Sequence, residues 1–159
     1  MFHTRVQGNF GAWRAAGGAS GRGEGSVSDN AKPGEAAAKV LVIDDSNTIR
    51  RSAEIFLKQG GYEVVLAEDG FDALAKVNDH EPDLIFCDIL MPRLDGYQTC
   101  AIIKRNPKFA HTPVIMLSSK DGLFDKARGR MVGSEDYLTK PFTKDQLLQA
   151  VEQYRRAVA

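Results

Sequence analysis

The fold is decided by the stretch Val40-Leu41-Val42-Ile43-Asp44-Asp45-Ser46. Four consecutive apolar residues indicate a strand that is covered on both faces, which is typical of a parallel sheet flanked by helices. Three later stretches repeat this pattern of a short, mainly apolar run that leads into a polar residue: Leu84-Ile85-Phe86-Cys87 before Asp88, Val114-Ile115-Met116-Leu117 before Ser118, and Tyr137-Leu138-Thr139 before Lys140. Because ligands bind beyond the carboxyl ends of parallel strands, we expect these polar residues to meet at one site.

Between the strand-like runs, the hydrophobic period changes to that of helices. The pattern predicts strands at 40–43, 62–67, 83–87, 113–117 and 136–138. It predicts helices over about 47–59, from 70 onward with Phe71, Leu74 and Val77 inward, over 96–105 and 123–132, and after Thr143 as N-cap. Regular alternation of this kind predicts an α/β fold. Right-handed crossovers favour a doubly wound, five-stranded parallel sheet in the order 2-1-3-4-5 with five helices, as in flavodoxin-like folds.

Residues 1–38 differ in composition from the rest of the chain. They hold 8 of the 15 glycines, and no helical or strand period organises them. Such a composition predicts a disordered N-terminal tail, with one folded domain over residues 39–158. The tail is either an unstructured extension or a docking arm that uses Phe10 and Trp13.

Charge and hydropathy limit the location and partners of the protein. The chain has 21 Lys and Arg against 21 Asp and Glu, so no overall field favours nucleic acid or an anionic membrane. Its apolar runs are far shorter than the roughly 20 residues of a transmembrane helix, and no signal peptide is visible. Cys87 and Cys100 do not form a CxxC motif, and we expect both to be buried free thiols. We therefore expect a cytoplasmic protein without membrane insertion.

The residues at the strand ends favour a metal and a phosphoryl group. Asp44, Asp45 and Asp88 would crowd three negative charges, and each pair at about 4 Å costs roughly 4 kcal/mol at an effective dielectric constant near 20. A cation relieves this repulsion, and an all-oxygen ligand set selects Mg²⁺ or a similar ion. Ser46 alone suffices to cap the following helix, so capping does not explain two acidic residues. Lys140 and Ser118 supply an ammonium and a hydroxyl for anionic oxygens.

Motifs of other chemistries are missing from the sequence. It contains neither a GxxxxGK[ST] loop nor a GxGxxG after the first strand, which argues against binding of nucleoside triphosphates or dinucleotides. It has no GxSxG elbow, and its three histidines are scattered. Leu90, two residues after Asp88, stands where the Asp-x-Asp pair of aspartate-dependent phosphatases has its general acid. A metal-dependent phosphatase is therefore a weaker alternative.

Four stretches together resemble the response-regulator receiver domain, a CheY-like family: Val40–Ser46, Asp88–Gly96, Leu117–Ser119 and Tyr137–Phe142. The resemblance covers about residues 39–158. It implies that Asp88 accepts phosphate from a histidine kinase with Mg²⁺ as cofactor. It also implies that Asp44 and Asp45 are the acidic pair, with Asp45, Asp88 and the backbone carbonyl of Leu90 as metal ligands.

The same resemblance assigns the remaining site residues. It implies that Ser118 is the switch hydroxyl, Tyr137 the switch aromatic and Lys140 the lysine that pairs with phosphate. We expect the output surface to be the face formed by the last two helices and the strand between them. Because the chain ends just past the last helix, we expect a single-domain, monomeric regulator that signals by protein contact and binds no nucleic acid.

A narrower resemblance suggests the pathway. Residues 91–100 and 118–126 are similar to the chemotaxis-like regulators of type IV pilus twitching motility. A pilus-motor or signalling protein would then be the target. We expect no enzymatic activity beyond self-phosphorylation and self-dephosphorylation. An alternative function is a phosphate sink, which drains a shared kinase without a target of its own.

Overall fold

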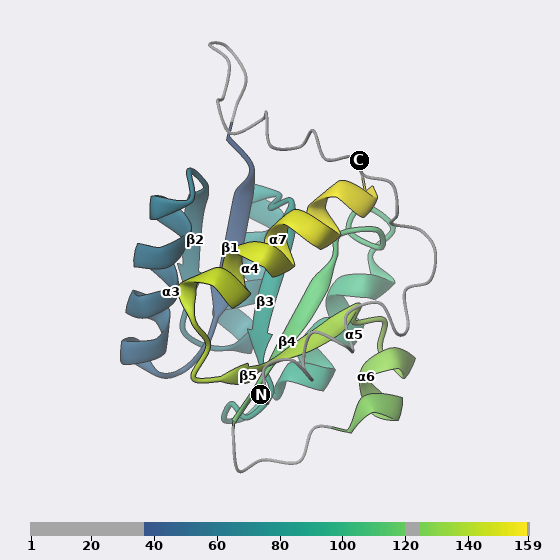
Figure 1. The fold of residues 1–159 in the computed structure, drawn as a ribbon. Helices are drawn as coiled ribbons and strands as arrows, with labels where there is room; N and C mark the ends of the chain where they lie inside the picture. The colour runs from purple at the N-terminus through teal and green to yellow at the C-terminus, as the bar shows by residue number, and fades with distance from the viewer. Residues whose placement is uncertain (1–36, 120–124, 159) are drawn as a thin grey trace.

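The computed structural model describes residues 37–119 and 125–158, in which five strands alternate with five helices (Figure 1). In chain order the elements are β1 (Lys39–Ile43), α3 (Asn47–Gln59), β2 (Glu63–Ala67), α4 (Gly70–His80), β3 (Leu84–Asp88), α5 (Gly96–Arg105), β4 (Val114–Ser119), α6 (Lys126–Met131), β5 (Asp136–Lys140) and α7 (Lys144–Val158). The predicted tail lies almost entirely outside the described residues, as does the beginning of the helix predicted over 123–132. None of the helices in the described ranges is long and apolar enough to cross a membrane.

The strands form one parallel sheet in the order β2-β1-β3-β4-β5, which confirms the predicted topology. Its register pairs Ile43 with Cys87, Asp88 with Leu117, and Ser119 with Lys140. The carboxyl ends of β1, β3, β4 and β5 therefore lie along the same edge. As expected, the polar residues that follow the apolar runs gather there.

Two hydrophobic cores cover the two faces of the sheet. Alternate strand residues point to opposite faces, so Val40 and Val42 pack in one core and Leu41 and Ile43 in the other. Helices α3 and α7 cover the first face, whereas α4 and α5 cover the second (Figure 1). Every residue of β3 is buried, as a central strand covered on both faces must be.

Side-chain caps fix where the helices begin. The Ser46 hydroxyl accepts a hydrogen bond from the backbone N–H of Ile49, as a cap of α3 should. Thr143 and Gln146 form a reciprocal capping box at the start of α7, with bonds of 2.9 and 3.1 Å. The predicted role of Thr143 as N-cap is thus confirmed, and both caps stand directly after strand ends that carry candidate site residues.

The inward orientation predicted for Phe71 is wrong. Its side chain is 52% exposed, and its ring lies 5.2 Å from the guanidinium carbon of Arg93. Gly70 takes the inward position of the first turn instead, where an added Cβ would lie 2.6 Å from the Thr99 hydroxyl. With Gly70 inward, the next residue, about 100° further around the helix, faces outward.

A carboxylate, Asp136, is buried at the start of β5. It accepts hydrogen bonds from the Tyr154 hydroxyl of α7 at 2.6 Å and from the Tyr137 backbone N–H at 2.8 Å. Burial raises the pKa of Asp136 to about 7, because it outweighs the opposing effects of these two hydrogen bonds and of the Lys126 charge. Asp136 therefore joins β5 to α7 through a group that titrates near neutral pH.

We expect Asp136→Asn to change how stability depends on pH. The pKa of Asp136 is higher in the folded chain than its ordinary value of 3.8. Its contribution to the free energy of unfolding is therefore fully present below pH 4 and is lost as pH rises through 7. The variant cannot ionise, so its deficit in unfolding free energy relative to the parent should shrink between pH 4.5 and 8. Chemical denaturation across this range measures the difference. The exposed Asp145→Asn is the control, and parallel pH profiles for the parent and Asp136→Asn would contradict the expectation.

Candidate functional site

A pocket of about 240 Å³ opens at the carboxyl edge of the sheet. It is lined by Asp44, Asp45, Ser46, Asp88, Ile89, Leu90, Ser118, Ser119 and Lys140. These residues come from the ends of β3, β4 and β5 and from the loops after β1 and β3. The structure thus brings together all the predicted site residues except Tyr137, which lies outside this lining.

The tight loop between β1 and α3 carries the acidic pair. Asp44 is fully buried, and its carboxylate accepts the Ser46 backbone N–H at 2.9 Å. Its own N–H donates to the Ala67 carbonyl, which extends the pairing of β1 with β2 by one residue. Asp45 is exposed at the mouth of the pocket. The loop therefore directs one carboxylate inward and leaves the next one accessible.

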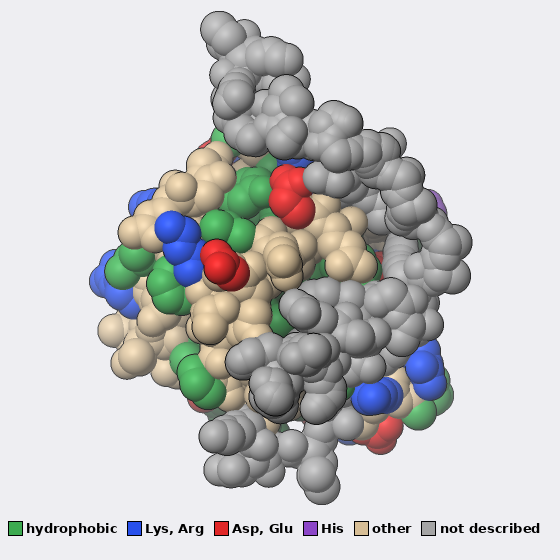
Figure 2. Space-filling model, in the orientation of Figure 1, with side chains coloured by type: hydrophobic (Ala, Val, Ile, Leu, Met, Phe, Trp, Pro, Cys, Tyr) green, Lys and Arg blue, Asp and Glu red, His purple; other side chains and the backbone are tan. Residues whose placement is uncertain are grey.

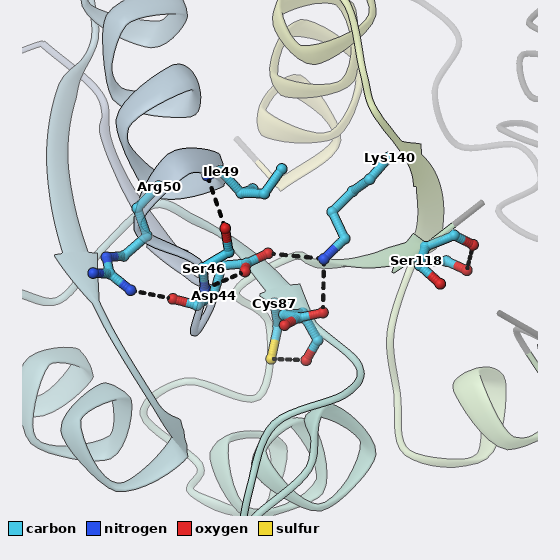
Figure 3. A network of polar contacts seen from close by, with 9 residues as sticks. Asp44, Ser46, Ile49, Arg50, Cys87, Ser118 and Lys140 are labelled. Atoms are coloured by element: carbon cyan, nitrogen blue, oxygen red, sulfur yellow. Dashed lines mark hydrogen bonds and ion pairs between the residues drawn. The ribbon is translucent and has the colours of Figure 1, made fainter. Parts of the chain in front are cut away.

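Lys140 connects the acidic residues across the sheet. Its Nζ lies 3.1 Å from Oδ2 of Asp44 and 3.1 Å from Oδ1 of Asp88 (Figure 3). The lysine ends β5, two strands away from β3, and its long side chain reaches back over the pocket. The peptide bond that follows it, to Pro141, is cis.

Electrostatic effects in the pocket oppose each other. Burial raises the pKa of Asp88 to about 6, and the negative charges of Asp44 and Asp45 add to this effect, whereas Lys140 lowers the value. Burial lowers the pKa of Lys140, but the charges of Asp44 and Asp88 outweigh burial and raise it above its usual 10.5. At neutral pH the site therefore holds a protonated lysine beside an Asp88 that is mostly ionised.

The donor set fits a hard divalent cation. Asp44, Asp45 and Asp88 each offer one carboxylate oxygen, and these three atoms lie within 4.8 Å of one another. The Lys140 ammonium pairs with two of these three carboxylates, so excess negative charge remains in the pocket. Oxygen ligands and uncompensated negative charge are what Mg²⁺ requires in proteins. Receiver domains typically bind Mg²⁺ at an acidic pocket of this kind.

The other predicted site residues lie around this group. Ser118 is buried in the pocket wall, and its hydroxyl donates to the Ser119 carbonyl at 3.3 Å (Figure 3). The Leu90 side chain is 68% exposed at the rim. Tyr137 is partly buried against the core on the α4–α5 side of the sheet, with the Lys126 Nζ 5.8 Å from its ring centroid. Ser118 thus lines the pocket together with Asp88 and Lys140, whereas Tyr137 lies outside the pocket lining.

Arg50 adjoins the site but was not among the residues predicted from the sequence. Its Nη1 donates to the Asp44 backbone carbonyl at 2.6 Å, and its Nη2 donates to the Asn47 side-chain oxygen at 3.2 Å. The only signal in the sequence is its place four residues after the N-cap Ser46, from which a long side chain reaches back to the loop. Cys87 and Cys100 are buried free thiols, as expected. Burial raises the pKa of the Cys87 thiol well above its usual range.

Comparison with known proteins places this geometry in a family. The response regulator receiver domain matches residues 40–152. Protein PilG of Pseudomonas aeruginosa is 68% identical over 114 residues, which are 72% of this chain and 84% of that protein. The alkaline phosphatase synthesis transcriptional regulatory protein PhoP of Bacillus subtilis is 40% identical over 105 residues, 66% of this chain and 43% of that protein.

A solved structure shares the fold. The chemotaxis protein CheY4 of Vibrio cholerae superimposes with a TM-score of 0.71 at 35% identity, covering 75% of this chain and 99% of that one. The family match spans all five strands and the pocket at their ends. The chain therefore belongs to the response regulator receiver domain family.

Proposed function

We propose that this chain is a phosphorylation switch in which Asp88 accepts a phosphoryl group from a histidine kinase. Membership of the family implies a histidine kinase as phosphodonor and a downstream target. The observation that carries the proposal is the contact of Lys140 with both Asp44 and Asp88 at 3.1 Å inside an acidic pocket. In this proposal, residues 39–158 are the signalling domain.

Asp88 is the nucleophile. Because its pKa is about 6, the carboxylate is mostly ionised at neutral pH, and although Asp88 is only 3% exposed, it lines the pocket that a phosphodonor would enter. One carboxylate oxygen forms a bond to phosphorus while the bond from phosphorus to the imidazole nitrogen of the donor histidine breaks. The product is an acyl phosphate on Asp88 and a histidine that has returned to its unphosphorylated form.

Asp44, Asp45 and Asp88 are the side chains that would hold Mg²⁺, with the Leu90 carbonyl as a further ligand implied by the family. When bound, Mg²⁺ neutralises the charge of the phosphoryl oxygens. Lys140 then pairs with a phosphoryl oxygen. The protein contributes position and charge, which are the main sources of catalysis in phosphoryl transfer. This role is that of a regulator rather than of a classical enzyme, and Leu90 offers no proton to a leaving group.

The proposed conformational change on phosphorylation begins at Ser118. Its hydroxyl donates to a neutral carbonyl at 3.3 Å, and an anionic phosphoryl oxygen is a stronger acceptor. Ser118 would move toward the phosphoryl group, and the partly buried Tyr137 ring would turn into the space that it leaves. The surface formed by α6, β5 and α7 would change as a result, through a local charge acting on an element with two states.

The α6–β5–α7 surface is the proposed output face. Helix α6 exposes Lys126, Arg128 and Arg130 and contains no acidic residue, and Figure 2 shows basic side chains at the lower right, where α6 lies. Met131 on the same helix is 83% exposed. These features support output by protein contact over a phosphate sink. The 68% identity to PilG supports a place in the control of type IV pilus twitching motility.

Phosphorylation should depend on Asp88. Incubation of the parent protein with acetyl phosphate and Mg²⁺ should add one phosphoryl group, detected by intact-protein mass spectrometry. Asp88→Asn should remain unmodified because the amide is not a nucleophile of comparable strength, whereas the exposed Asp79→Asn should be modified like the parent. Modification of Asp88→Asn to the level of the parent would refute the assignment.

Removal of the Asp88 charge should stabilise the metal-free protein at neutral pH. Since the pKa of Asp88 is raised from 3.8 to about 6, its ionisation costs stability, and this loss grows as pH rises from 4 through 6. In EDTA at pH 7.5, Asp88→Asn should melt at a higher temperature than the parent, and its advantage should shrink at pH 4.5. Thermal unfolding at both pH values measures this. A lower Tm for the variant at pH 7.5 would show that the attraction between Asp88 and Lys140 outweighs the burial of the Asp88 charge and its repulsion by Asp44 and Asp45.

Leu90 should slow hydrolysis of the acyl phosphate. It lies two residues after Asp88 at the rim, where an apolar side chain hinders the approach of water and an amide would orient it. Leu90→Asn should therefore lose its phosphoryl group faster than the parent in Mg²⁺ buffer, followed by mass spectrometry over time. Ile55→Asn, on the exposed side of α3, is the control. If Leu90→Asn decays at the parental rate or more slowly, Leu90 does not shield the bond.

A further inference from the structure

We propose that Arg50 is a positioning residue that fixes the peptide between Asp44 and Asp45 and thereby sets the place of the Asp45 carboxylate at the Mg²⁺ site. The inference rests on the proposed function, because it concerns the same metal site. It adds a residue outside the pocket lining, which reaches the site through the backbone.

The Arg50 guanidinium bonds both to the loop between β1 and α3 and to the first residue of α3. Nη1 donates to the Asp44 carbonyl at 2.6 Å, and Nη2 donates to the Asn47 side chain at 3.2 Å. The Arg50 backbone N–H also bonds to the Ser46 carbonyl at 3.0 Å, which anchors the base of the side chain in the first turn of α3. Figure 3 shows Arg50 and Lys140 on opposite sides of Asp44. The arginine therefore supports the loop from the side away from the pocket.

The peptide that Arg50 holds decides where Asp45 stands. The Asp44 carboxylate has its own restraints, because it accepts the Ser46 N–H and the Lys140 ammonium. In the part of the chain that the structure describes, the Asp45 carboxylate has no such side-chain or backbone donor, so its place depends on the backbone that carries it. The peptide is planar, and a carbonyl fixed in direction also fixes the bond that leads to the next Cα. Holding the Asp44 carbonyl thus holds Asp45.

A purely electrostatic role for Arg50 predicts the opposite effect on Mg²⁺. If the guanidinium acted only through its positive charge, its removal would reduce repulsion of a nearby cation, and Mg²⁺ would bind more tightly. If Arg50 positions the loop, its removal frees a metal ligand and Mg²⁺ binds more weakly. The planar, rigid guanidinium and its two separate acceptors favour positioning.

Arg51 provides a matched control. It is the next residue on the same helix and carries the same charge, but its side chain is 64% exposed and pairs with Glu54 at 3.2 Å on the surface. Arg51→Ala removes one positive charge near the site without removing a contact to the loop. A comparison of Arg50→Ala with Arg51→Ala therefore separates the hydrogen bonds from the charge.

The test is titration calorimetry of Mg²⁺ with the full chain. Groups that orient metal ligands typically change affinity by 10-fold or more, so Arg50→Ala should weaken Mg²⁺ binding about tenfold. Arg51→Ala should stay within about twofold of the parent, because exposed ion pairs contribute little. Arg50→Lys should recover part of the loss, since one ammonium reaches the carbonyl but cannot reproduce the two-point contact. Asn47→Ala, which removes only the second acceptor, should weaken binding less than Arg50→Ala.

Thermal melts in EDTA show whether each variant is folded, and Asn47→Ala serves as the test if Arg50→Ala does not fold. Mg²⁺ binding by Arg50→Ala that equals or exceeds that of the parent would overturn the positioning role. An equal loss in Arg51→Ala would overturn it as well, because a residue that makes no hydrogen bond to the loop would then have the same effect. If the parent itself binds no Mg²⁺, or if Asp45→Ala binds it like the parent, the proposed metal site fails first.

Discussion

The crowding of three carboxylates at the ends of β1 and β3 is the constraint on which the rest of the site depends. Their oxygens lie within 4.8 Å of one another, and a like-charged pair at such distances costs roughly 4 kcal/mol at an effective dielectric constant near 20. That is a large part of the 5–15 kcal/mol by which a typical domain is stable. The buried Asp44 and Asp88 cannot move apart, because β1 and β3 are packed between two cores. Lys140 offsets part of this repulsion, and a cation is needed for the remainder.

In the proposed function, the pocket is connected to the proposed output face through two neighbouring strands. The register pairs Ser118 of β4 with Thr139 of β5, and Met116 with Tyr137. In the proposed switch, a displacement of Ser118 would act on β5, where Tyr137 is followed three residues later by Lys140. At the other end of β5, Asp136 is bonded to Tyr154 of α7 at 2.6 Å. Strand β5 thus joins a residue of the pocket, an aromatic ring and a helix of the proposed output face within five residues.

The elements that could be predicted from the sequence are those with strong local signals. The bounds of α3 and α5 agree with the predicted ranges, because apolar spacing and the caps Ser46 and Asp95 define them. The strand order followed from apolar runs and crossover handedness. The outward turn of Phe71 could not be predicted, because it depends on how closely Gly70 approaches Thr99. The contact of Arg50 with the Asp44 carbonyl could not be predicted either, since it depends on a side-chain conformation that no spacing rule specifies.

In the proposed function, Lys140 is the shared cation whose partners must change. Before phosphorylation, its ammonium is divided between Asp44 and Asp88 at equal distances of 3.1 Å. An acyl phosphate moves the negative charge of Asp88 outward onto phosphoryl oxygens, and these are stronger acceptors than the neutral carbonyl oxygen that remains on Asp88. Asp44 keeps the Ser46 N–H when the lysine turns away, so it is not left as a buried charge without a donor. The hydrogen bond from the Ser46 N–H to Asp44 therefore lowers the free-energy cost of releasing Lys140. Ser46, which also caps α3, thus connects the loop that carries the proposed metal ligands to the proposed switch.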